Sequence, residues 1–331
     1  MSQFTNVIGI DVSKKTLDVH DHLHQVLAQL PNSPVGFKDL LKWVKKRNRE
    51  FNVLFCFEHT GMYSLPLAVS LSEQGLPYAM VPGLEIKRSL GLRRGKSDRA
   101  DAQAIARYAY QRREEIKIYQ LPSKYLLELK SLLSLREKMV SQRAGYQATK
   151  REMKAFLKIV KASSVLFDVQ DKMIKELNGQ ITKVENQILE LIKSDEQLKK
   201  TFDLVTSVKG VGLVLGTTML VYTNCFTAFD DWRKFACYCG IVPFEYQSGT
   251  SIKGKKKISR FANKRLKALL SNAACTSIQF NPEMKLYYER RIQEGKSKMS
   301  TQNIIRNKIV ARVFAVVHRG TPYVDTFRYA A

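Results

Sequence analysis

Val7-Ile8-Gly9-Ile10-Asp11-Val12-Ser13 is a short apolar run in which an aspartate stands where a buried strand would end. Runs of this length and composition are typical of strands. Residues 16–22 alternate apolar and polar side chains, which predicts a second strand after a turn at Ser13-Lys14-Lys15. Residues 25–30 can pair beside it. We therefore expect the chain to begin with three consecutive strands.

Helices and strands alternate after this beginning. Apolar residues at helical spacing predict helices over residues 37–47, 62–73 and 97–113, and apolar runs predict strands over 52–57 and 78–81. Three strands followed by such an alternation suit a mixed sheet covered by helices. This is the α/β pattern of a ribonuclease-H-like fold, which we assign to a first domain of residues 1–120.

The chain changes character in residues 121–200. Apolar residues step by threes and fours in a heptad-like stripe formed by Ile174, Leu177, Ile181, Val184, Ile188 and Leu191. The pattern predicts two long helices in a coiled-coil hairpin with a bend around residues 162–167. Such a hairpin serves either as a dimerisation arm or as an intramolecular helix pair, and the sequence favours neither.

Residues 201–331 are expected to form a mainly α domain. Helices are predicted over residues 232–238, 266–279, 284–293 and 302–317. Between them, residues 247–257 are rich in glycine, serine and lysine, which predicts a loop.

The charge balance points to a polyanionic partner. The chain of 331 residues has 55 Lys and Arg against 30 Asp and Glu, a formal net charge of +25. Residues 201–331 hold 21 basic and 8 acidic residues, about half of the excess. A surplus of this size favours binding to phosphates. No apolar run is long enough to span a bilayer, and we expect no membrane partner.

The N-terminus and the cysteines favour a cytoplasmic protein. The first residues lack the charged start and long apolar core of a secretory signal. The five cysteines are an odd number in a long chain, which argues against a disulfide framework. We expect a cytoplasmic protein that is associated with nucleic acid when bound.

Four carboxylates form a candidate metal site. Asp11 and Glu58 each follow an apolar strand, where a buried charge is costly without compensation. Asp98 and Asp101 are three residues apart, which places both on one helical face. Mg²⁺ prefers oxygen ligands and compensates such a cluster. Taken singly, each acid has a simpler role as a cap or a surface ion-pair partner, but the combination favours a metal site.

The segment Gln247-Ser248-Gly249-Thr250-Ser251 precedes a run of lysines. Glycines let the backbone approach a phosphate, and lysines neutralise it. A hydroxyl held there can attack phosphorus and form a covalent intermediate. The alternative is a loop that only grips phosphate, and the residues alone do not choose among Ser248, Thr250 and Ser251.

Five motifs in this order carry a resemblance to a known family. They are Ile8-Gly9-Ile10-Asp11-Val12-Ser13, Glu58-x-Thr60-Gly61, Lys96-Ser97-Asp98-Arg99-x-Asp101-Ala102, Val208-x-Gly210-Val211-Gly212 and Ser248-Gly249-x-Ser251. The chain resembles the DEDD transposases of the insertion-sequence one-ten family, which are related to the Piv DNA invertases. Two departures are Ser97, where threonine is usual, and Lys209, where proline is common.

The resemblance implies a RuvC-like N-terminal domain, a coiled-coil region and a C-terminal transposase domain with a turn similar to a helix-hairpin-helix. It implies that Asp11, Glu58, Asp98 and Asp101 bind Mg²⁺, with Mn²⁺ as an alternative ion, and that Ser248 is the nucleophile. It further implies donor and target DNA, a noncoding bridge RNA as guide, and dimers that assemble into a tetramer.

Nucleic-acid contacts are expected along three basic segments. The residues are Arg93, Arg94, Lys96, Lys209, Gly210, Gly212, Lys253, Lys255, Lys256, Lys257, Arg260, Lys264 and Arg265. The hypothesis that these features favour is a recombinase that cuts and rejoins DNA through a phosphoserine. One rival is a RuvC-like nuclease of the junction-resolvase type that uses water as nucleophile. Another is a non-catalytic RNA-binding protein.

Overall fold

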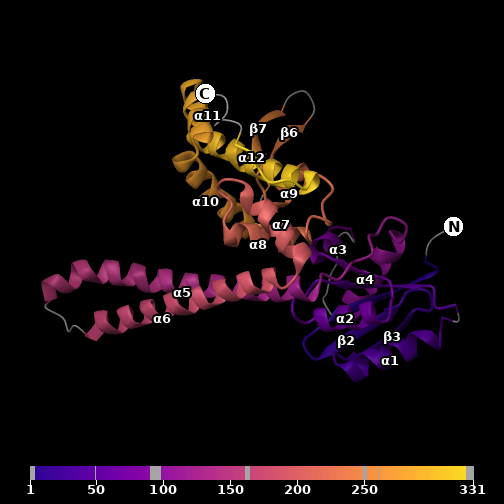
Figure 1. Ribbon diagram of the computed structural model, residues 1–331. Helices are drawn as coiled ribbons and strands as arrows, with labels where there is room; N and C mark the ends of the chain where they lie inside the picture. Colours follow the sequence, from indigo (N-terminus) through magenta and orange to yellow (C-terminus); the bar gives the residue numbers. More distant parts are fainter. Residues whose placement is uncertain are drawn as a thin grey trace. The chain divides into compact units, whose positions relative to one another are not determined.

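The computed structural model describes residues 4–48, 50–89, 98–160, 165–248, 252–259 and 261–325. The chain divides into two compact units, Met1–Leu121 and Pro122–Ala331, and each is described by itself. Figure 1 labels the helices and some of the strands along the chain. No helix in the described ranges has both the length and the apolar character needed to cross a membrane.

The first unit is built on a five-stranded mixed sheet with the order β3-β2-β1-β4-β5. The strands β1 and β2 and the strands β2 and β3 pair antiparallel, whereas β4 is parallel to both β1 and β5. The bounds are Asn6–Val12 (β1), Thr16–Asp21 (β2), Val26–Pro31 (β3), Val53–Glu58 (β4) and Tyr78–Val81 (β5). All five predicted strands and the mixed sheet are therefore confirmed.

Helices cover both faces of this sheet. One buried cluster joins Ile10 of β1 and Phe57 of β4 to α1 (Pro34–Lys45) and α2 (Leu65–Glu73). A second cluster joins Val7 of β1 to α3 (Gly83–Ser89) and α4 (Asp98–Gln111). Since side chains alternate between the two faces of a strand, every second residue of β1 faces α4.

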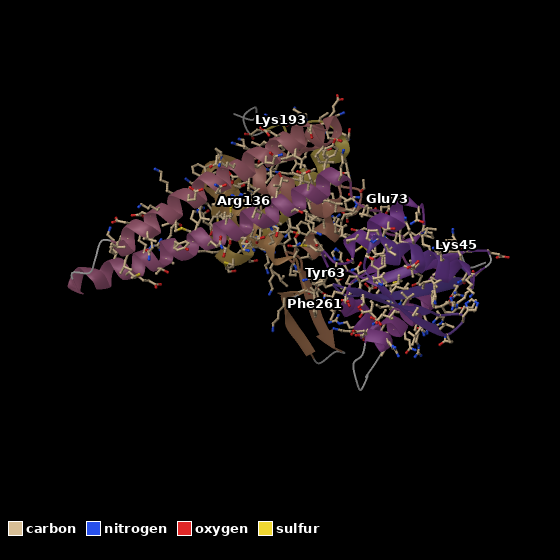
Figure 2. All side chains as sticks on the ribbon, turned by 90° about the horizontal axis from the view of Figure 1, so that it is seen from below. Lys45, Tyr63, Glu73, Arg136, Lys193 and Phe261 are labelled. Atoms are coloured by element: carbon tan, nitrogen blue, oxygen red, sulfur yellow. The ribbon has the colours of Figure 1, made fainter. Side chains whose placement is uncertain are left out.

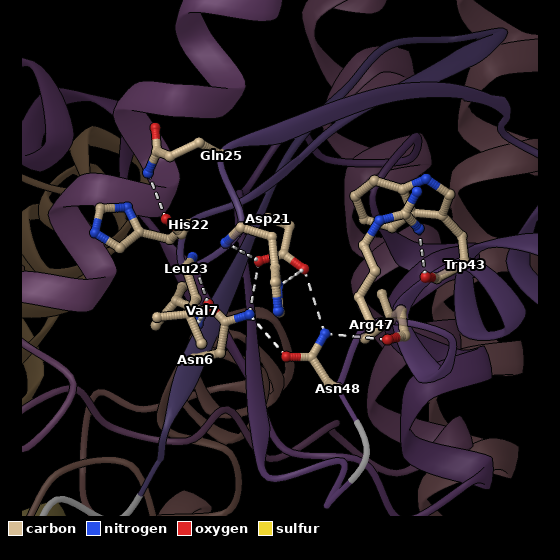
Figure 3. Close-up of polar contacts among 11 residues, drawn as sticks. Asn6, Val7, Asp21, His22, Leu23, Gln25, Trp43, Arg47 and Asn48 are labelled. Carbon is tan, nitrogen blue, oxygen red and sulfur yellow. Dashed lines mark hydrogen bonds and ion pairs between the residues drawn. The ribbon is translucent and has the colours of Figure 1, made fainter.

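A buried polar network fixes the start of β1 to the end of β2. Asp21 is fully buried and accepts hydrogen bonds from the side chain of Asn6 (2.7 Å), the side chain of Asn48 (3.3 Å) and the backbone of His24 (3.1 Å). Asn6 in turn donates to Asn48 (2.8 Å), as Figure 3 shows. Burial alone would raise the pKa of Asp21, but these hydrogen bonds outweigh it and lower the pKa.

Two long helices begin the second unit, α5 (Lys124–Val160) and α6 (Val165–Lys193). They lie side by side as a hairpin, which confirms the two predicted helices (Figure 1). Polar contacts hold them together: Arg136 donates to Glu185 at 2.7 Å, and Arg143 donates to Asn178 at 2.7 Å. Figure 2 labels Arg136 on α5 and Lys193 at the end of α6. Ile181, Ile188 and Leu191 of the heptad-like stripe are buried within the chain, so this part of the stripe serves intramolecular packing.

The remainder of this unit is mostly helical, as predicted. Its helices are α7 (Glu196–Ser207), α8 (Leu213–Thr223), α9 (Trp232–Tyr238), α10 (Lys264–Phe280), α11 (Pro282–Gln293) and α12 (Lys298–Arg319). Aromatic rings hold the centre of the core, where Phe314 of α12 contacts Phe226 at 5.0 Å and Phe235 at 5.5 Å between ring centroids. Such pairs favour packing beyond the area that they bury.

The prediction of a loop over residues 247–257 was wrong. Its described residues belong to a β-hairpin, in which β6 (Pro243–Ser248) pairs antiparallel with β7 (Ile252–Ile258). The glycines and lysines suggested flexibility, but Phe244 and Tyr246 favour an extended strand and the paired backbone supplies the hydrogen bonds. The basic run is therefore presented on a strand rather than on a loop.

Candidate functional site

Three carboxylates lie in a row across the middle strands of the sheet. Asp11 of β1 is the direct cross-strand partner of Asp18 of β2. On the other side, Ile10 pairs with Phe57 of β4, so that Asp11 and Glu58 come one residue later on adjoining strands. Residues in register on neighbouring strands point to the same face. Asp18, Asp11 and Glu58 therefore share one face of the sheet.

That face is the one covered by α4. Val7 packs in the cluster that contains α4, and Asp11 follows it at an even spacing along β1. On β4, Leu54 belongs to the same cluster, and Glu58 follows it at an even spacing too. The alternation that buries these apolar side chains thus places both carboxylates on the face that α4 covers, where the carboxylate of Glu58 lies against Gly83 at the start of α3.

The close approach of α4 to β1 depends on Gly9. A Cβ atom at this position would lie 2.5 Å from the carbonyl oxygen of Ala102 and closer still to the amide nitrogen of Ala106. The helix therefore rests directly on the strand backbone, two residues before Asp11. Its first turn carries Asp98 and Asp101, exposed and half-buried respectively. A helix N-terminus favours negative charge, which offsets part of their repulsion.

The charges of the other three predicted carboxylates act on Asp11. The pKa of Asp11 is raised from 3.8 to about 6, first by burial and then by the charges of Asp101, Asp98, Asp18 and Glu58, in this order. A carboxylate whose pKa is raised by neighbouring carboxylates lies in a negative electrostatic potential, and a bound cation reduces that potential. The structure thus brings together Asp11, Glu58, Asp98 and Asp101.

The donor set has the chemistry of a hard-cation site. It consists of carboxylates, the oxygen ligands that Mg²⁺ and Mn²⁺ prefer. Within the described ranges, no three His, Cys, Asp or Glu side chains are arranged as a ready metal site. His59, next to Glu58, instead accepts a hydrogen bond from the backbone of Gly61 at 3.1 Å through Nδ1. The fit of a divalent cation to this site therefore rests on the carboxylate donors and on their combined negative charge around Asp11.

Ser248, the predicted nucleophile, is the last residue of β6, and its backbone pairs with Ile252 of β7. It belongs to the second unit, whereas the carboxylates belong to the first. The other two candidate hydroxyls, Thr250 and Ser251, lie outside the described residues.

The glycine turn connects α7 to α8. Gly210 has a φ of +91°, a left-handed conformation that favours glycine, and a Cβ there would overlap the hydroxyl of Ser277. Gly212 is the N-cap residue of α8. Lys209, half-buried, forms an ion pair with Asp325 in the segment after α12. This turn presents helix N-terminal amides, which are suited to phosphate.

The predicted basic residues are in different environments. Lys257 and Lys264 are exposed, on β7 and at the first turn of α10. Arg265 donates to the carbonyl of Leu133 at 2.7 Å and pairs with Glu137 at 3.1 Å, which ties α10 to α5. Lys253, Lys255 and Lys256 belong to β7. Arg93, Arg94, Lys96 and Arg260 lie outside the described residues.

Asp18 is a carboxylate of this face that the sequence reasoning missed. It is the cross-strand partner of Asp11 and contributes to the raised pKa of Asp11. The signal was present, because a strand over residues 16–22 paired through a short turn places Asp18 opposite Asp11. A carboxylate at the end of an apolar run stands out in the sequence, whereas Asp18 lies inside a strand, where alternation makes a polar residue unexceptional.

Comparisons with known proteins agree with these features. Residues 8–161 match a family model described as "Transposase", and residues 202–289 match one described as "Transposase IS116/IS110/IS902 family". The chain is 27% identical over 327 residues to a pilin gene-inverting protein of Moraxella bovis, covering 96% of this chain and 97% of that protein. It is 29% identical over 158 residues to an uncharacterised insertion element IS110 protein of Streptomyces coelicolor, covering 46% and 38%.

The fold, the acidic face and these matches define an enzyme of DNA recombination, a transposase whose substrate is DNA. The chain belongs to the IS110 family of transposases, the insertion-sequence one-ten family whose motifs it carries. DEDD transposases of this kind typically require a divalent metal ion.

Proposed function

We propose that this transposase cuts and rejoins DNA through a covalent phosphoserine at Ser248, assisted by a divalent cation at Asp11, Glu58, Asp98 and Asp101. The observation that supports the cation site most strongly is the gathering of these carboxylates on the α4 face, where they raise the pKa of Asp11. The N-terminal unit is on this proposal a RuvC-like, ribonuclease-H-like domain. Its strand order and its placement of acids are compatible with that assignment.

In the proposed reaction, the Ser248 hydroxyl oxygen bonds to the scissile phosphorus, and the bond from phosphorus to the departing strand oxygen breaks. The net result transfers the serine proton to that oxygen. A hydroxyl of the partner strand then attacks the phosphoserine and releases Ser248. Mg²⁺, when bound, supplies Lewis-acid stabilisation of the charge that develops on the phosphate. The phosphodiester energy is conserved throughout, which allows rejoining without an external energy source.

The nucleic-acid contacts are proposed for the basic residues named in the sequence. Lys257 and Lys264 are exposed and available to phosphates, while the lysines of β7 extend the same basic strand. The turn at Lys209, Gly210 and Gly212 is proposed to act as a helix-hairpin-helix-like phosphate site. The net charge of +25 is large enough to favour a second polyanion, and we propose a noncoding bridge RNA as guide to donor and target DNA.

Assembly is proposed to complete the active site. The carboxylates and Ser248 belong to different units, so catalysis requires the two to meet, in one chain or between copies. The three-part division into residues 1–120, 121–200 and 201–331 assigns dimerisation to the coiled-coil hairpin. Its distal part carries exposed apolar residues at Val165, Leu166 and Val169, which suit contact with a second copy. Dimers would then pair as a tetramer.

The decisive experiment is the covalent trap. Wild-type protein and Ser248→Ala are incubated with element-end DNA and Mg²⁺, denatured, and analysed for protein-linked DNA, with Thr250→Ala and Ser251→Ala as matched hydroxyl controls. We expect the adduct in wild type and in both controls and none in Ser248→Ala. A Ser248→Ala protein that still cuts DNA would support the water-using nuclease instead. Loss of the adduct in Asp11→Asn with DNA binding retained would support the metal role, whereas wild-type protein that binds RNA but neither cuts nor joins DNA would favour the non-catalytic RNA-binding alternative.

The Moraxella relatives are named as proteins that invert the pilin gene. We propose that the same cut-and-rejoin chemistry operates in this chain and that the arrangement of the recombined sites decides between inversion and transposition. A plasmid assay with the sites in inverted or separate positions tests this directly.

A further inference from the structure

The carboxylate of Asp18 is buried and only half satisfied. The residue is 2% exposed. One oxygen, Oδ1, accepts a hydrogen bond from Nε2 of Gln29 at 3.0 Å, across the pairing of β2 with β3. The other oxygen, Oδ2, is buried and has no hydrogen-bond partner within the described ranges. A buried carboxylate oxygen without a partner has lost its hydrogen bonds to water and gained none from the protein, which destabilises the fold.

The position of Asp18 makes this cost harder to explain by structure alone. It is the cross-strand partner of Asp11 and lies on the same face of the sheet, under α4. Side chains that face each other across an antiparallel pair have Cβ atoms about 4.5–5.5 Å apart, and like charges there destabilise the pair. A serine, threonine or asparagine would tie β2 to Gln29 without that penalty.

We propose that Asp18 is a positioning residue of the cation site, whose free oxygen accepts hydrogen bonds from water molecules retained by a divalent cation on Asp11. This inference rests on the proposed function of the four carboxylates. Mg²⁺ gives up its water reluctantly and is bound with several waters in place. A carboxylate one water away from Asp11 matches the spacing of a cross-strand pair. Gln29 holds the other oxygen and thereby fixes the direction of Oδ2.

The rival interpretation is that Asp18 only joins β2 to β3 through Gln29. It predicts that removing the charge leaves cation affinity unchanged and costs stability alone. Two variants separate the interpretations. Asp18→Asn keeps the shape and an acceptor for Gln29 but offers no second acceptor for water. Gln29→Met, on an exposed side chain, removes the donor that orients Asp18 and changes no charge.

The experiment is a calorimetric titration of the full-length protein with Mn²⁺ in the absence of nucleic acid, with melting in EDTA as a check on folding. Asp39→Asn, on α1 at the opposite face, is the matched control for the loss of one negative charge. We expect about a 10-fold or greater loss of affinity for Asp18→Asn, the effect typical of residues that support metal ligands, and a smaller loss for Gln29→Met. Asp39→Asn should bind as wild type does.

Asp11→Asn distinguishes a failure of the proposed cation site from a failure of the proposed role of Asp18. If wild type and Asp11→Asn bind Mn²⁺ equally, the proposed cation site itself is wrong. If Asp11→Asn loses binding but Asp18→Asn retains it, the site stands and the role of Asp18 is overturned. A loss in Asp18→Asn without any loss in Gln29→Met would indicate a through-space charge effect and would also overturn the positioning role.

Discussion

The ammonium group of Lys209, in the turn between α7 and α8, forms an ion pair with the carboxylate of Asp325 in the segment that follows α12. The same segment is held by a hydrogen bond from the backbone of Tyr323 to the hydroxyl of Ser207 at 2.8 Å. The lysine proposed to bind phosphate is therefore engaged by a carboxylate of its own chain. DNA must compete with Asp325 for this cation.

Removing the competing carboxylate should strengthen DNA binding. We expect Asp325→Asn to bind duplex DNA about 3- to 10-fold more tightly at low salt, since ion pairs of this kind contribute about 1 kcal/mol. Lys209→Met should bind more weakly and lose about one from the slope of log affinity against log salt. Fluorescence anisotropy at several salt concentrations measures both. Asp203→Asn, exposed on α7, is the control. An equal gain in DNA affinity in that variant would show that the change in net charge, and not the release of Lys209, causes the effect.

The contact between Gly9 and α4 should not tolerate a methyl group. A Cβ at this position meets backbone atoms of Ala102 and Ala106, which cannot rotate away. We expect Gly9→Ala to destabilise the protein by about 1–3 kcal/mol, the usual cost of overpacking. Because the helix must move, Asp98 and Asp101 move with it, and recombination should fall by more than the fraction of unfolded protein explains.

Urea unfolding and a recombination assay at a temperature where both proteins are folded distinguish the two effects. Gly145→Ala is the control, because a Cβ at this helical position meets nothing within 4 Å. That substitution should be neutral or stabilise by about 1 kcal/mol through helix propensity. Full activity in a folded Gly9→Ala protein would show that α4 does not position the acids.

The sequence predicted the first unit well because its signals are local. Apolar alternation locates the strands, and the acids at the ends of β1 and β4 are visible in the letters around Asp11 and Glu58. The predicted i, i+3 pair also falls within the first turn of α4. Local periodicity therefore supplied the sheet, the helices α1, α2 and α4 and four carboxylates of the candidate site, whereas the short helix α3 was not predicted.

Features that depend on pairing across the chain escaped prediction. Asp18 matters through its register with Asp11, and the hairpin of β6 and β7 exists because two unremarkable segments satisfy each other's backbone. The partner of Lys209 is more than a hundred residues away at Asp325. Such relations follow from tertiary packing, which overrides local composition.

The burial of Asp11 and the negative charges around it predict that this residue lowers stability while it supports activity. Its pKa is raised to about 6 in the folded protein, so the ionised form is disfavoured by folding at higher pH. We expect Asp11→Asn to abolish recombination but to stabilise the metal-free protein at pH 8 by about 1 kcal/mol, a discounted figure because the carboxylate is only half-buried. Urea unfolding in EDTA measures the gain.

The pH dependence of this stability difference follows from the protonation of Asp11 in the folded and unfolded states. Above pH 6 the folded state carries the disfavoured charge, whereas below about pH 4 Asp11 is protonated in both states. The stability advantage of Asp11→Asn should therefore shrink as the pH falls from 8 to 4. An advantage that is independent of pH would point to packing rather than charge.

The network around Asp21 should make the first unit sensitive to acid. Its pKa is lowered in the folded protein, so its contribution to stability is present above the ordinary value of 3.8 and is lost as the pH falls below it. Asp21→Asn turns one acceptor into a donor that faces Asn48 and His24, and we expect a loss of about 2–3 kcal/mol at pH 7. Because protonated Asp21 loses the same hydrogen bonds, the difference between variant and wild type should narrow toward pH 2. Thermal melts across this range test the prediction, with Asp39→Asn as control, and a constant difference would contradict it.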